Sequence, residues 1–530
     1  MELSKNVKNL IEQHKLWRQD IEPKSGDANI SVDEVAARVA SFYEKIRGVV
    51  DWREEHLLRK TAIERILKRR VFTRTPGEDF AEPFLEELIR GVHFPNESIP
   101  RRKIPEIQQI VAKYLFLIEH SSQGAEDRLL AQLQGWLLGI AAAEIEETLT
   151  SPRRERGLID FMAQGIGQDI IIKNGGTISE EDKKIQIYVA VQRALFKLDD
   201  STISYHLFER IYPLWKNPPQ EILAEIANGI HALQERIKVI LSRPLLSEKL
   251  YQLVERYDTP YLLIGDIVAE NPDGFLELAE NPARLEAAMK NAYIARLSKL
   301  KGKMNRAALY GTISVFLSKI LIALAAEVPF DKYITHEFNM TTIGISVVIP
   351  PLLMLLLVTS IKTSSEENFQ KVMLEVMRIA FATDKRNAHE LSSPKKRGVI
   401  LNVVINAMYL ASFVLSFGFL FFILTQLNFS VLSSIVFLLF ISLIAFGGTR
   451  IRQRGAELLI GEQKQGFLYS VFDFFTLPLI LTGRWLSKQV ARYNILVVLL
   501  NFLIEIPFQV FVEFLEHWRS FLKEKKEEVH

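Results

Sequence analysis

The sequence of residues 398–449 is GVILNVVINAMYLASFVLSFGFLFFILTQLNFSVLSSIVFLLFISLIAFGGT, a run of 52 residues without one charged side chain. A helix that crosses a bilayer needs about 20 consecutive apolar residues, so this run is long enough for two. The polar turn TQLNFS (425–430) divides it. The run therefore predicts two membrane helices, at about 400–424 and about 430–448.

Two further stretches of bilayer length precede this run. AALYGTISVFLSKILIALAA (307–326) has one charge, and TTIGISVVIPPLLMLLLVTSI (341–361) has none. A single stretch of this kind could be a buried helix of a soluble protein, but four close together favour a bilayer. We therefore predict a four-span membrane domain over 307–449, with a kink in its second span at Pro350 and Pro351.

Lys and Arg residues are concentrated in alternate loops between these spans. Five lie between 296 and 306, eight in the loop 362–397 and four in 450–465, whereas the turn 425–430 has none. Because cytoplasmic loops carry the excess of Lys and Arg, we expect a multi-pass protein of the cell inner membrane with both termini in the cytoplasm. The basic loops are expected to contact the lipid bilayer at anionic headgroups.

The loop 362–397 also contains a helical pattern. Ser364 and Glu367 have the spacing of a capping box, and apolar side chains then recur on one helical face. We expect a cytoplasmic amphipathic helix at 364–383. It could pack on the bilayer surface or on the N-terminal domain.

Residues 450–515 contain two apolar stretches that are interrupted by charges. The first, 466–482, includes Asp473 and Pro478. In the second, 494–515, polar side chains recur every four residues, at Asn501, Glu505, Gln509 and Glu513. A polar stripe of this kind is typical of a helix that lies in the membrane interface. Interfacial or re-entrant helices are therefore favoured, two further spans are the alternative, and 516–530 is predicted to be a charged cytoplasmic tail.

The N-terminal part differs in charge from the rest of the chain. Residues 1–300 carry 41 Lys and Arg against 46 Asp and Glu, whereas residues 301–530 carry 24 against 17. Helical periodicity runs through 1–281 and predicts an acidic cytoplasmic domain, either a bundle or an irregular solenoid. DIIIKNGG (169–176) alone favours a short strand or a helix end, and Pro282 begins a basic connecting helix over 282–306. The predicted fold class is all-α.

Sequence signatures of catalysis and cofactor binding are missing. The chain has no cysteine, which excludes disulfides, thiolate metal sites and cysteine nucleophiles. It has no phosphate-binding loop, dinucleotide fingerprint, HExxH, GxSxG or kinase signature, and its ten histidines form no i,i+4 pair. We therefore expect no catalytic, cofactor-binding or metal-ligating residues and no cofactor. Basic clusters such as RRK (101–103) lack interleaved aromatic residues, so nucleic-acid binding is not expected.

Five polar side chains within the apolar stretches are candidates for a role inside the membrane: Lys319, Asn402, Asn406, Asp473 and Glu505. Ionisable residues inside a membrane are functional candidates by default. Lys319 lies about 18 Å into the first span, and helical side chains lean toward the N-terminal end of their helix, here the cytoplasmic end. We predict a polar layer that receives the Lys319 ammonium, with Asp473 as the preferred partner and Asn406 as the next. A hydrated or neutral lysine is the alternative.

Three functions are compatible with this sequence. The first is a non-catalytic membrane-tethered scaffold or regulatory protein, whose helical domain binds a cytosolic protein partner. The second is a small-solute or ion transporter or channel with a polar layer at Lys319. The third is a membrane enzyme that acts on lipid, with Asp473 or Glu505 near the interface. The large domain and the missing catalytic signatures favour the first.

Overall fold

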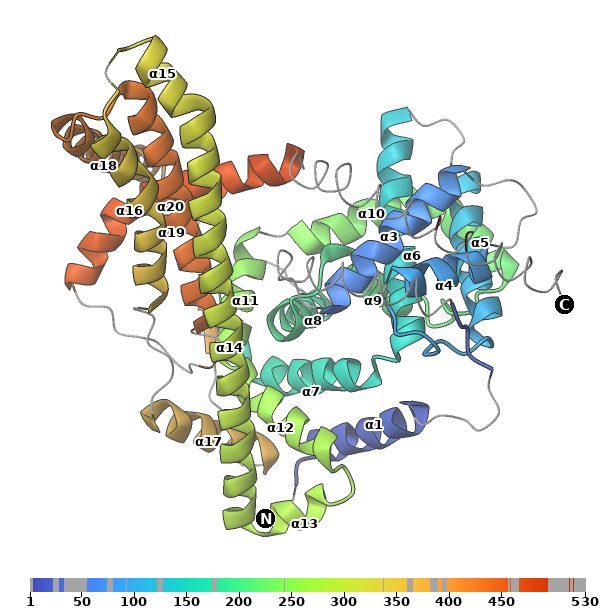
Figure 1. Ribbon diagram of the computed structural model, residues 1–530. Coiled ribbons are helices and arrows are strands. Elements are labelled where there is room, and N and C mark those ends of the chain that lie inside the picture. The colour runs from blue at the N-terminus through green and yellow to red at the C-terminus, as the bar shows by residue number, and fades with distance from the viewer. Residues whose placement is uncertain are drawn as a thin grey trace, which may run out of the picture. The chain divides into compact units, whose positions relative to one another are not determined.

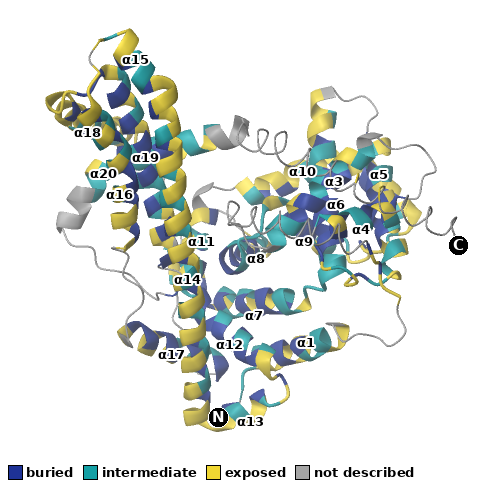
Figure 2. Cartoon of the chain, in the orientation of Figure 1, coloured by how far each residue is buried: buried dark blue, intermediate teal, exposed yellow. Residues whose placement is uncertain are grey.

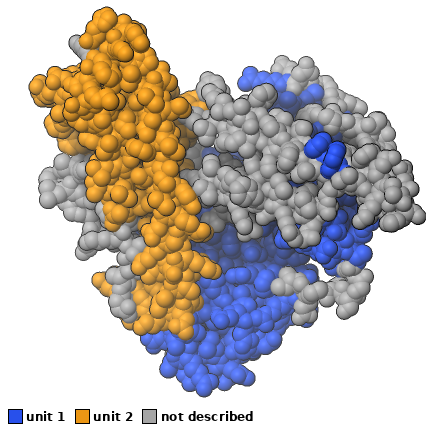
Figure 3. All heavy atoms as spheres, in the orientation of Figure 1, with its two compact units in different colours: residues 1–289, 374–394, 508–530 blue, residues 290–373, 395–507 orange. Residues whose placement is uncertain are grey.

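The computed structural model describes residues 3–21, 28–32, 55–73, 80–91, 93–121, 127–173, 179–242, 244–336, 338–359, 366–381, 389–392, 398–455, 458, 467–493, 514 and 518. The chain forms two compact units. Unit 1 comprises 1–289, 374–394 and 508–530, and unit 2 comprises 290–373 and 395–507 (Figures 1 and 3).

Both units are helical, as the sequence predicts. The described helices up to the connecting helix are α1 (Lys5–Ile21), α3 (Glu55–Thr73), α4 (Ala81–Arg90), α5 (Lys103–His120), α6 (Asp127–Thr150), α7 (Arg153–Asp169), α8 (Glu180–Phe196), α9 (Asp200–Ile211), α10 (Gln220–Ser242), α11 (Pro244–Arg256), α12 (Asp258–Glu270) and α13 (Phe275–Glu280). The later ones are α14 (Pro282–Ile322), the π-helical turn η1 (Ala323–Glu327), α15 (Val328–Tyr333), α16 (Met340–Thr359), α17 (Glu366–Ala380), α18 (Val399–Gln426), α19 (Val431–Gly455) and α20 (Phe467–Tyr493). Helices α14 and α17 have residues in both units. The all-α prediction is confirmed.

Helix α6 lies at the centre of unit 1. It packs against α3, α5 and α9, and it is largely buried (Figure 2). An apolar run from Leu137 to Ala143 explains this position, because a helix that is apolar on every side must be buried all round. Its last turns are also buried but carry Glu144, Glu146 and Glu147, so carboxylates enter the core at the C-terminal end of α6.

Polar caps fix several helix starts. Ser179 Oγ accepts a hydrogen bond from Asp182 N at 3.0 Å, and Asp199 Oδ1 accepts one from Thr202 N at 3.0 Å. Asn281 Oδ1 accepts from Ala283 N at 3.1 Å, and the connecting helix α14 begins at the next residue, Pro282, as predicted. These contacts satisfy first-turn N–H groups that have no partner inside the helix.

The segment 374–394, which we call the inter-span segment, is part of unit 1 although it lies between two membrane-length helices in the sequence. Strand β2 (His389–Ser392) pairs in parallel with β1 (Ile170–Lys173), in the register Ile171↔Glu390. Of the two structures predicted for 169–176, a short strand or a helix end, the strand is the one observed, but the sequence gives no sign of its partner strand. The described residues of this segment therefore pack on the N-terminal domain.

Further contacts hold the inter-span segment in place. Arg378 Nη2 donates to Asp169 Oδ2 at 3.0 Å, directly before β1. Ser4 N donates to the carbonyl oxygen of Ala380 at 3.0 Å, and the rings of Tyr257 and His389 lie 4.7 Å apart. Contacts therefore run from α17 to β2 and involve three different parts of unit 1.

Four described helical stretches are long and apolar enough to cross a membrane: 282–333, 340–359, 399–426 and 431–453. Their positions agree with the four predicted spans. The first is longer than predicted, because η1 and α15 continue it past its predicted end at residue 326 to Tyr333. The predicted second interfacial stretch, 494–515, lies almost wholly outside the described residues.

Helix α20 packs against α18 and α19, and Pro478 lies inside it. Proline has no N–H, so it cannot bond to the carbonyl oxygen of Phe474 four residues earlier. Ser412 Oγ on α18 donates to this carbonyl at 2.6 Å, and Ser416 Oγ donates to that of Phe475 at 2.8 Å. Serine side chains of a neighbouring helix thus satisfy carbonyl groups at the proline, as apolar surroundings require.

Helices α19 and α20 approach each other closely at Gly483. A Cβ atom at this position would overlap the carbonyl oxygen of Ser442, and it would lie 2.9 Å from Phe446 Cβ. Small residues at helix crossings allow backbones to approach in this way within a bilayer. The absence of a side chain at Gly483 is therefore a packing requirement.

Candidate functional site

Lys319 and Glu327 form a buried ion pair in unit 2. Neither side chain has exposed surface, and Lys319 Nζ donates to Glu327 Oε1. The ammonium also lies 5.4 Å from the ring centroid of Phe440 on α19, within the range of a cation–π contact. Removing two charges from water costs several kcal/mol per ion, and good geometry together with further hydrogen bonds is needed to offset that cost.

The π-helical turn explains why these two residues meet. Glu327 follows Lys319 by eight residues, and in a continuous α-helix it would lie about 80° away around the axis. η1 covers Ala323–Glu327, and a π turn contains more residues than an α turn, so it rotates Glu327 back toward Lys319. The axial separation is about 12 Å, so Lys319 extends toward the C-terminal end of its helix.

Helix α16 supplies a third member of this site. Ser346 Oγ donates to Glu327 Oε2 at 3.2 Å, and the Ser346 side chain is fully buried. Buried residues of α16 recur every four positions, at Thr342, Ser346, Pro350, Met354 and Val358. The two hydroxyl residues of this stripe, Thr342 and Ser346, lie at the end that contacts the ion pair, and the other end is apolar.

Asp331 lies one turn after Glu327, on α15. It is 4% exposed, and its Oδ2 accepts a hydrogen bond from Ser433 Oγ on α19 at 3.2 Å. Its Oδ1 is buried and has no hydrogen-bond partner in the described structure. We call Lys319, Glu327, Asp331, Ser346 and Ser433 the polar layer.

The predicted partner of Lys319 is wrong. Asp473 is half-buried on α20, and the ammonium is bound by Glu327 instead. The predicted first span ends at residue 326, so Glu327 is expected in a loop. Lys319 is expected to lean toward the N-terminal end of its helix, whereas the π turn and α15 bring a carboxylate to its C-terminal side.

The remaining predicted polar residues do not join the polar layer. Asn402 and Asn406 are both exposed on α18. Glu505 lies outside the described residues. Pro350 and Pro351 are buried inside α16, which continues through them to Thr359. The structure therefore brings Lys319 together with residues that the sequence analysis did not select.

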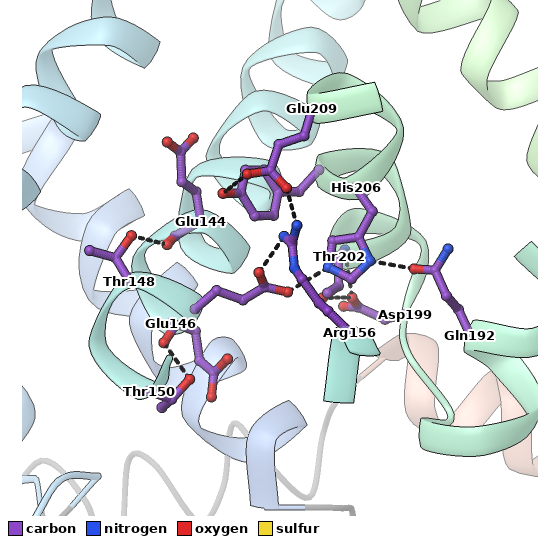
Figure 4. Close-up of polar contacts among 12 residues, drawn as sticks. Glu144, Glu146, Thr148, Thr150, Arg156, Gln192, Asp199, Thr202, His206 and Glu209 are labelled. Carbon is purple, nitrogen blue, oxygen red and sulfur yellow. Dashed lines mark hydrogen bonds and ion pairs between the residues drawn. The ribbon is translucent and has the colours of Figure 1, made fainter. Parts of the chain in front are cut away.

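A second buried polar cluster lies in unit 1, where α6, α7 and α9 meet (Figure 4). Glu147 on α6 accepts from both Arg156 and His206, and Arg156 also pairs with Glu209. His206 Nδ1 contacts Gln192 Oε1 at 2.5 Å. Burial alone would raise the pKa of Glu147, but His206 and Arg156 hold it at about 2.

The hydrogen bonds of Gln192 orient its side chain toward His206. Gln192 Nε2 donates to the carbonyl oxygen of Tyr188 at 3.3 Å, so Oε1 is the atom that faces the histidine. An amide oxygen only accepts, so His206 Nδ1 is the donor in this contact. On the other side of the ring, Nε2 contacts Glu147 Oε1 at 2.5 Å.

A buried group around Glu144 adjoins this cluster. Lys113 Nζ donates to Glu144 Oε1 at 2.6 Å, while Tyr114 and Trp215 donate to Oε2 at 2.7 and 3.1 Å. Burial raises the pKa of Glu144 and lowers that of Lys113. Nearby, burial raises the pKa of Glu146 to about 7, although Arg59 opposes this shift.

A pocket of about 1120 Å³ opens beside these groups in unit 1. Its lining includes Glu147, Arg156, Tyr205 and Lys216, together with other charged residues of both signs. Several cations of its wall pair with carboxylates, as Arg153 does with Asp20 and Lys216 with Glu209. The sequence signal for this region is the run EIEE (144–147), which follows the apolar part of one helix.

Within the described ranges, no group of three or more His, Asp or Glu side chains is arranged to hold a metal ion. No protein-family model, curated protein or solved structure matches this chain.

Proposed function

We propose that this chain is a multi-pass protein of the cell inner membrane that acts as a tethered scaffold or regulatory protein, and that its helical unit 1 binds a cytosolic protein partner. The observation that carries the proposal is the inter-span segment. Its strand β2 pairs with β1, and Arg378 pairs with Asp169, so a connection between two spans is built into unit 1.

The chain connects unit 1 to the membrane-length helices more than once, although one connection would be enough to tether a domain. A single connection through α14 would hold a soluble domain at a membrane. Here the chain enters unit 1 a second time, between α16 and α18, and forms contacts there that cost conformational entropy. A partner that changes unit 1 near β1 would act on the connection between two spans, and the reverse effect follows by linkage.

The distribution of basic residues supports the proposed orientation. Residues 1–289 and 374–394 belong to one compact unit, so they lie on the same side of a bilayer. The basic residues before 307 and in 362–397 favour the cytoplasm for that side, with anionic headgroups beside them. A cytosolic protein partner would then have access to unit 1.

The test is capture of a partner by the full-length protein in lipid nanodiscs. Wild type is compared with Arg378→Ala, which removes the pair with Asp169, and with Lys15→Ala, which removes an exposed pair with Asp273 as the matched control. We expect one protein at near-stoichiometric amount on wild type and control, with altered affinity on Arg378→Ala. Folded wild type that retains no protein at such an amount would contradict the proposal.

A second candidate is transport of a small ion, favoured by the Lys319–Glu327 pair. Intramembrane charges often mark ion pathways, and this pair is completely buried. Flux of Na⁺, K⁺ and protons into proteoliposomes tests it, with Glu327→Gln as the variant. Equal flux for wild type, variant and empty vesicles would remove this candidate.

A further inference from the structure

The polar layer contains one more negative than positive charge. Lys319 and Glu327 compensate each other. Asp331 forms no ion pair with any described residue, and Ser433 Oγ is the donor that it has. Lys332, the next residue, is exposed with its ammonium beside the Tyr333 ring. The layer therefore consists of two carboxylates and one ammonium.

The two carboxylates lie close together on one helix face. Glu327 and Asp331 are four residues apart, a spacing at which like charges destabilise a helix. The groups that α16 and α19 contribute to the layer, Ser346 and Ser433, are uncharged hydroxyls. Neither hydroxyl can neutralise the extra charge.

One buried oxygen atom of the polar layer, Asp331 Oδ1, has no hydrogen-bond partner among the described residues. Asp331 is 4% exposed. An unpartnered carboxylate oxygen at such burial is costly, and a bound positive charge would remove that cost.

We propose that Asp331 binds one monovalent cation, with Ser433 as its positioning neighbour. The ion is an alkali-metal ion, for which carboxylate and hydroxyl oxygens are suitable ligands. It brings the polar layer to zero net charge. This inference concerns unit 2 alone and is independent of the proposed partner of unit 1.

The experiment is thermal unfolding of the full-length protein in nanodiscs. Samples contain NaCl, KCl or choline chloride at equal ionic strength and equal pH. Wild type is compared with Asp331→Asn and with Asp473→Asn, a matched loss of one half-buried carboxylate elsewhere in unit 2. Ser433→Ala is a milder second variant, which keeps the test valid if Asp331→Asn fails to fold.

An alkali-metal site predicts that the Tm of wild type rises with Na⁺ or K⁺ but not with choline, by about 3–5 °C for each tenfold increase above Kd. Asp331→Asn should lack this rise, Asp473→Asn should behave like wild type, and Ser433→Ala should weaken the response. A wild-type Tm that is equal in Na⁺, K⁺ and choline, or a cation response that Asp331→Asn retains in full, would overturn the proposal.

Discussion

Replacement of Glu327 by Gln should be strongly destabilising, because it leaves the Lys319 ammonium buried without a counter-charge. Gln has the shape of Glu and can still accept from Ser346, so the change removes charge and little else. Breaking one side of a buried ion pair costs about 3–5 kcal/mol. For a unit of this size we expect Tm to fall by roughly 6–20 °C.

The double variant Lys319→Met, Glu327→Gln should recover most of that loss. Met fills nearly the same volume as Lys without a charge, and replacement of a complete buried pair is often close to neutral. The coupling free energy between the two positions should therefore be about 2–4 kcal/mol. Chemical unfolding in detergent, followed by tryptophan fluorescence, measures the four members of the cycle.

The matched control is Lys319→Met with Asp473→Asn. Since Asp473 does not contact the ammonium, these two changes should be additive within about 0.5 kcal/mol. Additivity between positions 319 and 327, or coupling between 319 and 473, would refute the assignment of the ion pair.

Three further predictions concern packing and pH. Gly483→Ala should cost about 1–3 kcal/mol through overlap of helices α19 and α20, whereas Gly418→Ala, with open space around it, should be close to neutral; both are measured as Tm in detergent. Ser412→Ala should cost about 1–2 kcal/mol, and less in a Pro478→Ala background, where the restored backbone N–H bonds to the same carbonyl; equal losses in both backgrounds would argue against this account. Glu146, with its pKa raised to about 7 from an ordinary 4.5, destabilises the folded state increasingly as pH rises from 4.5 to 7. The unfolding free energy of Glu146→Gln should therefore increase by about 3 kcal/mol relative to that of wild type between pH 4.5 and pH 8. A difference in unfolding free energy that does not change with pH would contradict this prediction.

The sequence predicts the helical architecture well because apolar runs and charge bias are local properties. The run 398–449 has no charge, and α18 and α19 lie in it as predicted. Pro282 and the apolar strand at 170–173 are likewise visible without a structure. These features depend on short-range chemistry, which one chain displays directly.

The polar layer could not be predicted because it depends on helix geometry and on contacts between distant residues. Glu327 follows a continuous apolar stretch, so hydropathy assigns it to a loop. The π turn that rotates it toward Lys319 cannot be predicted from the sequence pattern. The pairing of β1 with β2 joins residues more than 200 positions apart. The register of such a pair depends on packing, so neither strand's sequence predicts it alone.

The most direct test of the account is a cysteine pair across β1 and β2 in the full-length protein. The chain has no cysteine, so any disulfide that forms must join the two engineered cysteines. Ile171 and Glu390 are directly opposite in register, and both are exposed. Mild oxidation in nanodiscs, followed by mass spectrometry of linked peptides, should find a disulfide in Ile171→Cys, Glu390→Cys. It should find none in Ile171→Cys, Leu391→Cys, where the side chains point to opposite faces. Equal linkage of both pairs, or none in either, would contradict the claim that the inter-span segment is part of unit 1.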